Sequence, residues 1–366
     1  MKKILHITTW YPNEYDNQLG VFIKKHIQLG HSFANNVVIA IIPDSRVKKP
    51  KATVNKDKNF VEIIGYYRAR AGSKWSNYRN YQRVQTLVLQ ELLKMDFMPD
   101  FIHCHVGEKS IALANKFFPQ TPRFVTEHWS GFLNGTFDSY KEKRRKKRIA
   151  EINTCNQLFV VSESLKRALK NYGVTIPIAI IPNVIEQGKV KSNYSTPPKF
   201  VVVADLIDDV KNISGIIKAY QDAAFEEGIT LTIVGDGPDR DKLEKLAQDS
   251  SITFLGKQDN EWVLTNLSEF DILIVNSKIE TYSMITAEAL LCGLPVVAAK
   301  CGGPEQFVEH GKNGWLVEVD NSNELMLTLQ KAVKLLPSIS PDEVSKSIKD
   351  LISIEKVRQT FEHLYS

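Results

Sequence analysis

The stretch FDILIVNSKIETYSMITAEALLCGLPVVAA, residues 270–299, decides the fold that this sequence predicts. It opens with a short apolar run, continues into a helical stretch that starts near Tyr282, and closes with a second apolar run. Short β-type runs that alternate with helices are typical of a parallel sheet with helices on both faces. The stretch therefore predicts an α/β fold.

The same alternation extends over the chain in two series, separated by a linker near residues 183–198 that is rich in Pro, Gly, Asn and Ser. With 366 residues, the chain is long enough for two domains. We expect a first doubly wound domain over residues 1–185, joined by a C-terminal helix at about 343–366, and a second over residues 198–342. Ligands bind at the carboxyl ends of the strands of such sheets, so two such domains facing each other would enclose one central cleft.

The β-type runs of the first series are KILHIT (3–8), VVIAII (37–42), DFIHCH (100–105) and RFVTEH (123–128), and those of the second include KFVVVAD (199–205), ITLTIVGDGPD (229–239), SITFLG (251–256) and LPVVAA (294–299).

Composition places the chain in the soluble globular class, with 43% hydrophobic and 24% charged residues. No stretch approaches the roughly 20 apolar residues that cross a bilayer. The start, MKKILHITTW, predicts a buried strand rather than a signal peptide because its apolar run ends too early. The four cysteines are scattered without metal-ligand spacing, which suits a reducing compartment. We therefore expect a cytoplasmic protein, peripheral at most at the inner face of the membrane.

The two halves of the chain carry opposite net charge. Residues 1–190 hold 30 Lys and Arg against 15 Asp and Glu, a net charge of +15, and the remainder holds 17 against 27, a net charge of −10. A basic half attracts nucleic acid, phosphorylated lipid or a membrane surface. The sequence shows no recognisable nucleic-acid module and no aromatic interleaving in its basic run, so nucleic acid is not expected.

That basic run is YKEKRRKKR, residues 140–148. It fits either a solvated helix face or a contact with anionic lipid headgroups or a lipid diphosphate, to which each basic residue contributes about 1 kcal/mol. The candidate membrane or acceptor residues are Lys143, Arg144, Arg145, Lys146, Lys147 and Arg148.

A pair of glutamates, Glu280 and Glu288, surrounds the predicted start of the helix after the strand DILIVN. Thr281 or Ser283 is expected to cap this helix, which leaves backbone N–H groups and the positive end of the helix dipole as an anion site. The CGGPE turn that follows the next strand is expected to bring Glu305 close to the same place.

With these features the sequence resembles the retaining, nucleotide-sugar-dependent glycosyltransferases of family 4, which have the GT-B fold. The resemblance covers nearly the whole chain. Its motifs are the E-x7-E pair Glu280 and Glu288, ALLCGLPVVA (289–298), GGPEQ (302–306), NGWLV (313–317), GVF (20–22), HCH (103–105), TEH (126–128), SES (162–164), IPNV (181–184), VKN (210–212) and VGDGP (234–238).

The resemblance implies roles for the residues around the glutamate pair. Glu288 would hold the ribose hydroxyls of the donor nucleotide, and Glu280 would hold hydroxyls of the donor sugar. The backbone of Tyr282, Ser283 and Met284 would contact the diphosphate or the sugar, and Lys211 would neutralise a phosphate charge.

Further roles follow from the same resemblance. Gly20 would let the backbone approach the diphosphate, because a β-carbon there would block it. Gly235 is a candidate donor contact, and the alternative is that Gly235 and Gly237 are only turn glycines. His128 would lie beside the transferred sugar from the acceptor-side, N-terminal domain. The donor would be a UDP- or GDP-sugar, with base recognition near Lys257 and Gln258, and no cofactor or metal is expected. The acceptor would be a glycan or a polyprenyl-diphosphate-linked glycan of a cell-surface polysaccharide.

One position departs from the family pattern. Family members usually carry an arginine six residues before the lysine, where this chain has Asp205. Either Asp205 points elsewhere or another cation, for which Arg240 is a candidate, contacts the phosphates. The DRD sequence at 239–241 resembles a metal-binding D-x-D motif, but it falls at a helix start, where we expect its aspartates to cap.

His103 and His105 alternate along a predicted strand, and we expect them to face opposite sides of the sheet, which argues against a shared metal. Two other functions stay open. One is a nucleotide-sugar epimerase of GT-B fold, which would need its own acid and base around the sugar. The other is a noncatalytic glycosyltransferase-like subunit, for which Asp205 is the main support and against which Glu280, Glu288 and Lys211 count.

Overall fold

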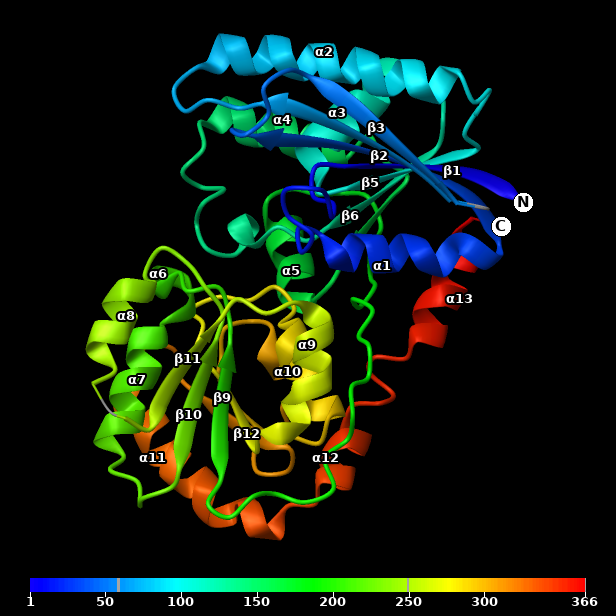
Figure 1. Ribbon diagram of the computed structural model, residues 1–366. Helices are drawn as coiled ribbons and strands as arrows, with labels where there is room; N and C mark the ends of the chain where they lie inside the picture. The colour runs from blue at the N-terminus through cyan, green and yellow to red at the C-terminus, as the bar shows by residue number, and fades with distance from the viewer. Residues whose placement is uncertain (58–59, 249, 366) are drawn as a thin grey trace. The chain divides into compact units, whose positions relative to one another are not determined.

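The computed structural model describes residues 1–57, 60–248 and 250–365, which divide into two compact units (Figure 1). Unit 1 comprises Met1–Val184 and the C-terminal segment from Ile354. Unit 2 is Ile185–Ser353. The expected linker at 183–198 belongs to unit 2 from Ile185 on. Lys191 packs there, because its side chain is 7% exposed and its Nζ lies 3.1 Å from Asp271 Oδ1.

Within the described residues, unit 1 holds an eight-stranded sheet in the order β3-β4-β2-β1-β5-β6-β7-β8. All neighbouring strands are parallel except β3 and β4, which form an antiparallel pair at one edge. The residues of β1 from Ile4 to Thr8 are buried, as expected for a strand covered on both faces. The strands are β1 (Lys2–Thr8), β2 (Ala34–Asp44), β3 (Lys51–Asp57), β4 (Phe60–Arg68), β5 (Phe101–His105), β6 (Arg123–Glu127), β7 (Gln157–Val160) and β8 (Ile178–Ile180).

Helices cover both faces of this sheet. Figure 1 shows α2, α3 and α4 on one side and α1 on the other. Phe361 of α13 packs with Ile4 and Phe124 in the core of unit 1. The helices of unit 1 are α1 (Val21–Leu29), α2 (Lys74–Leu93), α3 (Gly107–Phe117), α4 (Glu142–Ile152), α5 (Glu163–Asn171) and α13 (Ile354–Leu364).

The C-terminal segment of unit 1 begins later than the sequence predicts. The expected helix at about 343–366 is two helices, α12 (Pro341–Ser347) and α13. α12 belongs to unit 2, where the Ser345 hydroxyl donates a hydrogen bond of 2.7 Å to the Leu291 carbonyl. Ser366, the end of the predicted helix, lies outside the described residues.

Unit 2 contains, in its described part, a six-stranded sheet whose order is β11-β10-β9-β12-β13-β14 and whose neighbouring pairs are all parallel. From β9 the chain builds first toward β11 and then, from β12, toward β14. The strands are β9 (Lys199–Val203), β10 (Thr230–Val234), β11 (Ile252–Gly256), β12 (Ile272–Val275), β13 (Val296–Ala299) and β14 (Gly314–Val317), and the remaining helices are α6 (Asp208–Lys211), α7 (Ile213–Asp222), α8 (Arg240–Leu246), α9 (Asn260–Asn266), α10 (Met284–Leu291) and α11 (Ser322–Leu335).

The predicted fold class, two α/β units each built on a parallel sheet, is confirmed. No helix in the described part of the chain combines the length and the apolar character needed to cross a membrane. The four cysteines are buried and free of disulfide bonds.

Candidate functional site

The strand order of unit 2 reverses between β9 and β12, and this switch point determines where a ligand is expected. β9 and β12 are hydrogen-bonded neighbours, so the loops that follow them start side by side. The Lys278 N–H donates to the Val210 carbonyl at 2.8 Å and ties the two loops together. In open parallel sheets, ligands bind outside the carboxyl ends of the strands at such a point. The loop after β9 leads to Lys211, and the loop after β12 holds Glu280.

Lys211 and Glu280 form an ion pair at this point. Lys211 Nζ lies 2.6 Å from Glu280 Oε1, and the Ser277 hydroxyl donates to the same oxygen at 2.8 Å. The side chains are 24% and 17% exposed, so both can still reach a ligand. Burial alone would lower the pKa of Lys211, but the Glu280 carboxylate raises it above its ordinary value. Lys211 is therefore a fixed cation at neutral pH.

The amino end of α10 lies directly after Glu280. Ser283, the residue before the helix, has φ 64° and ψ 70°, a left-handed conformation that costs a non-glycine residue about 1–3 kcal/mol. No side-chain hydrogen bond caps α10, and the Ser283 hydroxyl instead pairs with the Thr286 hydroxyl at 2.8 Å. The expected cap by Thr281 or Ser283 is therefore wrong. An uncapped helix start with a strained residue is typical of an anion-binding position.

The GGPEQ turn packs against this helix start. A β-carbon at Gly303 would lie 2.7 Å from Glu280 Cβ and 2.9 Å from the Tyr282 carbonyl carbon, so only glycine fits. The Glu280 N–H donates to the Cys301 carbonyl at 3.0 Å. Both carboxylate oxygens of Glu305 accept the Gly302 N–H at 2.9 Å, so Glu305 folds onto its own turn. The turn therefore fixes the backbone of Glu280.

Glu288 lies in α10, one turn after its first residue, and is 3% exposed. Glutamate on a surface helix is usually solvated, and a carboxylate is rarely buried without a partner. Because Glu288 is buried, Glu280 and Glu288 do not form an exposed pair on one helix face.

Asp205 lies near Lys211, and Arg240, the candidate cation for the phosphates, is the first residue of α8, after β10. Asp205 is exposed after β9, and its charge helps to raise the pKa of Lys211. Arg240 Nε lies 2.8 Å from Glu244 Oε1, and its Nη1 lies 3.8 Å from Asp236 Oδ2. Arg240 is thus already paired with two carboxylates of its own helix region.

The glycines and aspartates of the loop after β10 have structural partners. Gly235 has φ 142°, and a β-carbon there would lie 1.8 Å from the Ala204 carbonyl oxygen. Asp239 precedes α8, as expected of the DRD sequence, but its carboxylate accepts the Asp208 N–H at 2.8 Å rather than capping α8. Packing of this loop against the end of β9 therefore requires Gly235, with or without a ligand.

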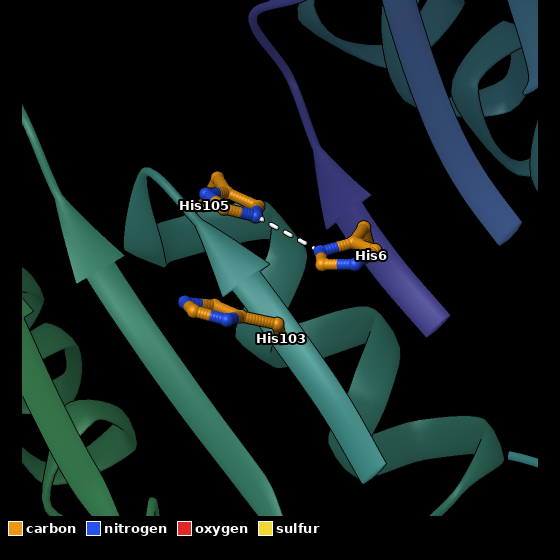
Figure 2. Close-up of side chains that lie close together, drawn as sticks. All are labelled: His6, His103 and His105. Atoms are coloured by element: carbon orange, nitrogen blue, oxygen red, sulfur yellow. Dashed lines mark hydrogen bonds between the residues drawn. The ribbon is translucent and has the colours of Figure 1, made fainter. Parts of the chain in front are cut away.

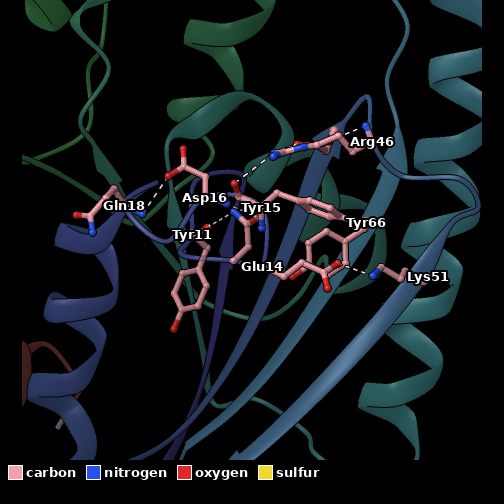
Figure 3. Close-up of polar contacts among 10 residues, drawn as sticks. Tyr11, Glu14, Tyr15, Asp16, Gln18, Arg46, Lys51 and Tyr66 are labelled. Carbon is pink, nitrogen blue, oxygen red and sulfur yellow. Dashed lines mark hydrogen bonds and ion pairs between the residues drawn. The ribbon is translucent and has the colours of Figure 1, made fainter. Parts of the chain in front are cut away.

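In unit 1, Gly20 starts α1 with φ 67°. A β-carbon there would lie 2.5 Å from the Trp10 carbonyl oxygen, so the glycine is required by its own loop and not only by a ligand. Figure 3 shows how side chains hold this loop: the Arg46 guanidinium lies 4.7 Å from the Tyr15 ring centroid, and Glu14 forms an ion pair with Lys51. The loop after β1 is therefore anchored to the turn after β2 and to β3.

His128 follows β6 and is 5% exposed. Its ring centroid lies 4.6 Å from that of Phe22 and 5.9 Å from that of His26, and its ring nitrogens have no hydrogen-bond partner among the described residues. Burial, followed by the neighbouring His26, lowers its pKa well below the ordinary value. His128 is a neutral imidazole in an aromatic environment.

The prediction that His103 and His105 face opposite sides of the sheet is wrong, because residues two apart on a strand share a face. Figure 2 shows both rings beside His6, and the His6 Nδ1 to His105 Nε2 distance is 3.2 Å. The rings of His103 and His105 are 4.5 Å apart between centroids and 7° from parallel. Lone pairs lie in the ring plane, so parallel stacked imidazoles do not direct them at one ion. The histidines form a hydrogen-bonded stack, in which His103 also contacts Thr126 Oγ1 at 2.6 Å.

Glu127 and Arg148 form a buried ion pair that the sequence analysis missed. Arg148 Nη2 lies 3.2 Å from Glu127 Oε2, with side chains 5% and 0% exposed. Glu127 Oε1 accepts the backbone N–H groups of His128 and Trp129, each at 3.0 Å. The pair thus holds the loop that carries His128. Glu127 is part of the TEH motif, which was the available signal, whereas Arg148 was wrongly grouped with the exposed basic run.

The other cations of that run lie on α4 with different partners. Lys143 is exposed, and Lys146 Nζ lies 2.6 Å from Glu142 one turn earlier. Arg144 makes two hydrogen bonds to Glu108 of α3, at 3.1 and 2.9 Å. The remaining pairs are Arg145 with Asp138 at 3.1 Å and Lys147 with Glu151 at 3.7 Å.

Comparison with known proteins adds two family matches and several relatives. Residues 36–188 match the model of Glycosyltransferase Family 4, and residues 184–338 match that of Glycosyl transferases group 1. N-acetyl-alpha-D-glucosaminyl L-malate synthase of Bacillus anthracis is 26% identical over 186 residues, 49% of this chain and 48% of that protein. The lipopolysaccharide core biosynthesis glycosyltransferase LpsE of Rhizobium meliloti is 23% identical over 59% of this chain and 63% of its own length. The chain thus matches about half to two thirds of these relatives.

The fold is also found in solved structures. The structure of Anabaena HepE in complex with UDP and glucose superposes with a TM-score of 0.73 over 100% of this chain and 99% of that chain, at 16% identity. Such low identity supports the fold alone. Since the two family models together span residues 36–338 and meet near the boundary between the units, the chain belongs to the family 4, group 1 glycosyltransferases and has the GT-B fold.

Proposed function

We propose that the chain transfers a sugar from a UDP- or GDP-sugar to a glycan or lipid-linked acceptor, with retention of the anomeric configuration and without a metal ion. The observation that carries this proposal is the Lys211–Glu280 pair at the uncapped amino end of α10. This arrangement offers a fixed cation, backbone N–H groups and a carboxylate at one switch point, which suits a sugar linked to a diphosphate.

The donor would bind with its diphosphate at the start of α10, near the backbone of Tyr282, Ser283 and Met284. Lys211 would neutralise part of the phosphate charge, and Glu280 would accept hydrogen bonds from hydroxyls of the sugar. Glu288, further along α10, would hold the ribose hydroxyls. A site of this kind accelerates transfer by stabilising the diphosphate charge as it develops.

In the reaction, the bond between the anomeric carbon and the diphosphate oxygen breaks, and the acceptor oxygen bonds to the same face of that carbon. The leaving phosphate takes the acceptor proton, so no carboxylate nucleophile is required. His128 stays a predicted contact of the transferred sugar from unit 1, where its neutral ring suits a hydrogen bond rather than a charge.

The biological setting is part of the proposal. The similarity to a lipopolysaccharide core glycosyltransferase supports a role in cell-surface polysaccharide synthesis. We infer a cytoplasmic protein, peripheral at the inner face of the membrane, that meets a polyprenyl-diphosphate-linked or glycan acceptor there.

A thermal-denaturation screen with UDP- and GDP-sugars tests the donor assignment. A ligand at 100 times its Kd stabilises the folded state by about 2.7 kcal/mol. One nucleotide sugar should raise the Tm of the wild type and of Glu309→Ala, an exposed control in unit 2, but raise it far less for Glu288→Ala and Glu288→Gln. Equal stabilisation of all four proteins would show that the donor does not bind at Glu288. A separate incubation of each nucleotide sugar without acceptor tests the alternative function, because an epimer product would favour an epimerase.

A further inference from the structure

Two neighbouring cavities of unit 1 share the lining residues Glu108, Lys109 and Arg148. The first, here the strand-end cavity, has a volume of about 380 Å³ and adjoins the carboxyl ends of β1, β2 and β5. The second, here the helix cavity, has a volume of about 330 Å³ and lies among α2, α3 and α4. The shared residues make the two cavities parts of one recess.

The two cavities differ in chemistry. The strand-end cavity presents three aromatic side chains, Trp10, Trp129 and Tyr140. Aromatic walls with few polar groups are typical of small-molecule sites, and strand ends are where ligands of such sheets bind. The helix cavity instead presents cations and two tyrosines of α2. Its charged lining residues are Glu108, Lys109, Lys116, Arg144, Lys147, Arg148 and Glu151.

Of the cations that line the helix cavity, three pair with carboxylates of the described residues and two do not. Arg148 is neutralised by Glu127, Arg144 by Glu108, and Lys147 faces Glu151 at 3.7 Å. Lys109 and Lys116 of α3 have no carboxylate partner within 4.0 Å among the residues that the structure describes. Lys109 Nζ instead lies 5.0 Å from the Tyr81 ring centroid and 3.3 Å from the Tyr67 hydroxyl. The helix cavity thus carries an excess positive charge suited to a dianion.

The positions of the cations on α4 distinguish binding in the helix cavity from general attraction to a basic surface, because only some of them line the cavity. Arg144, Lys147, Arg148 and Glu151 recur at helical spacing and line the helix cavity. Lys143 and Lys146 do not line it. Diffuse attraction to an anionic surface would draw on both faces of the helix, whereas a bound group would draw on the cavity face alone.

We propose that the helix cavity binds a phosphate or diphosphate group of the acceptor, whose saccharide end enters the strand-end cavity. This inference rests on the proposed glycosyl transfer and adds the site that would bind a phosphate of the acceptor. A phosphate could come from a lipid diphosphate or from a phosphorylated glycan. The exposed Trp75 and Tyr78, three residues apart on α2 and 81% and 55% exposed, offer an apolar surface that would suit the lipid.

Calorimetric titration with inorganic pyrophosphate, farnesyl diphosphate and glucose 6-phosphate tests the proposal. Lys109→Gln/Lys116→Gln removes two cavity charges, and Lys143→Gln/Lys146→Gln removes two charges outside it. We expect the Kd of at least one probe to rise about tenfold in the first variant and less than twofold in the second. Binding at any other phosphate site is the same in all these proteins and cancels in the comparison.

The three probes separate the sources of the phosphate. A cavity-dependent Kd for farnesyl diphosphate alone assigns a lipid-linked acceptor, and one for glucose 6-phosphate assigns a phosphorylated glycan. Lys109→Arg/Lys116→Arg, which keeps the charges, should retain binding. Absence of binding by every probe, or equal weakening in both double variants, would overturn the proposal.

Donor stabilisation, measured by thermal denaturation with nucleotide sugars, is read separately. Lys109→Gln/Lys116→Gln should keep it, because the donor residues proposed above lie in unit 2. If no nucleotide sugar stabilises any of these proteins, the proposed function fails. The phosphate titrations would still show whether the helix cavity binds a phosphate group.

Discussion

The two units differ in how exposed their ionisable groups are and in whether these groups carry charge. In unit 2, Lys211 and Glu280 stay partly exposed and charged at the switch point of the sheet. In unit 1, the core around β1 and β5 holds buried histidines whose pKa values burial lowers, and the buried cation Arg148 pairs with Glu127. The difference indicates that charge serves ligand binding in unit 2 and local structure in the core of unit 1.

The largest effect is expected where a buried charge of unit 1 loses its partner. Arg148→Ala leaves Glu127 uncompensated, which should lower the free energy of unfolding by about 3–5 kcal/mol. Arg145→Ala removes a partly exposed pair with Asp138 and should cost about 1 kcal/mol or less. Urea unfolding measures both, and equal losses would show that Arg148 acts as an ordinary surface residue.

The histidines of unit 1 predict a loss of stability in mild acid. The folded-state pKa values of His6 and His26 are about 4, below the ordinary value of 6.5, so below pH 6.5 the unfolded chain binds more protons than the folded one. At pH 5 this amounts to as much as about 4 kcal/mol for the two residues together. The loss begins near pH 6.5 and grows until pH 4.

Hydrogen exchange, followed by mass spectrometry from pH 7.5 to 5, would resolve this effect by unit. Protection should fall more in β1 and α1 than in β9 and β12, after correction for the intrinsic exchange rate. Unit 2 holds a single histidine, His310, and serves as the internal control. Parallel losses in both units would contradict a role for the histidines.

The charged pair of unit 2 should affect turnover more than stability. Lys211→Met removes the cation proposed to stabilise the leaving diphosphate and should lower turnover about 10²- to 10³-fold. Glu280→Ala should also lower turnover, with little change in unfolding because the pair is partly exposed. Lys312→Met, which breaks an exposed pair with Glu309, is the matched control. Donor consumption measures turnover, and wild-type rates in both site variants would show that the site lies elsewhere.

The same contrast explains what the sequence could predict. The resemblance to family 4 pointed to Lys211, Glu280 and Glu288, and the structure brings Lys211 and Glu280 together at the switch point of unit 2. The antiparallel edge pair β3–β4 was missed because Lys51–Asp57 is exposed and mostly polar, without a buried apolar run.

Contacts between distant residues could not be read in this way. The Glu127–Arg148 pair joins β6 to α4 across 21 positions, and the His103 partner Tyr365 is 262 positions away. Only the packing of helices on the sheet brings these residues together. The predicted capping of α10 is wrong for a local reason, since the Ser283 hydroxyl pairs with the Thr286 hydroxyl three residues later.

The smallest effect is expected for the exposed lysines of α4, whose replacement tests for a membrane contact that does not involve the helix cavity. Lys143 and Lys146 are exposed on α4, and each should contribute about 1 kcal/mol to binding of anionic vesicles. Lys143→Gln/Lys146→Gln should therefore weaken binding to phosphatidylglycerol vesicles, measured by co-sedimentation, by roughly thirtyfold. Lys331→Gln/Lys334→Gln, at the same spacing on α11 of the acidic unit 2, should leave it unchanged. Equal binding of the wild type to phosphatidylcholine and phosphatidylglycerol vesicles would remove the basis for a membrane contact, because the exposed cations of unit 1 would then attract no anionic surface.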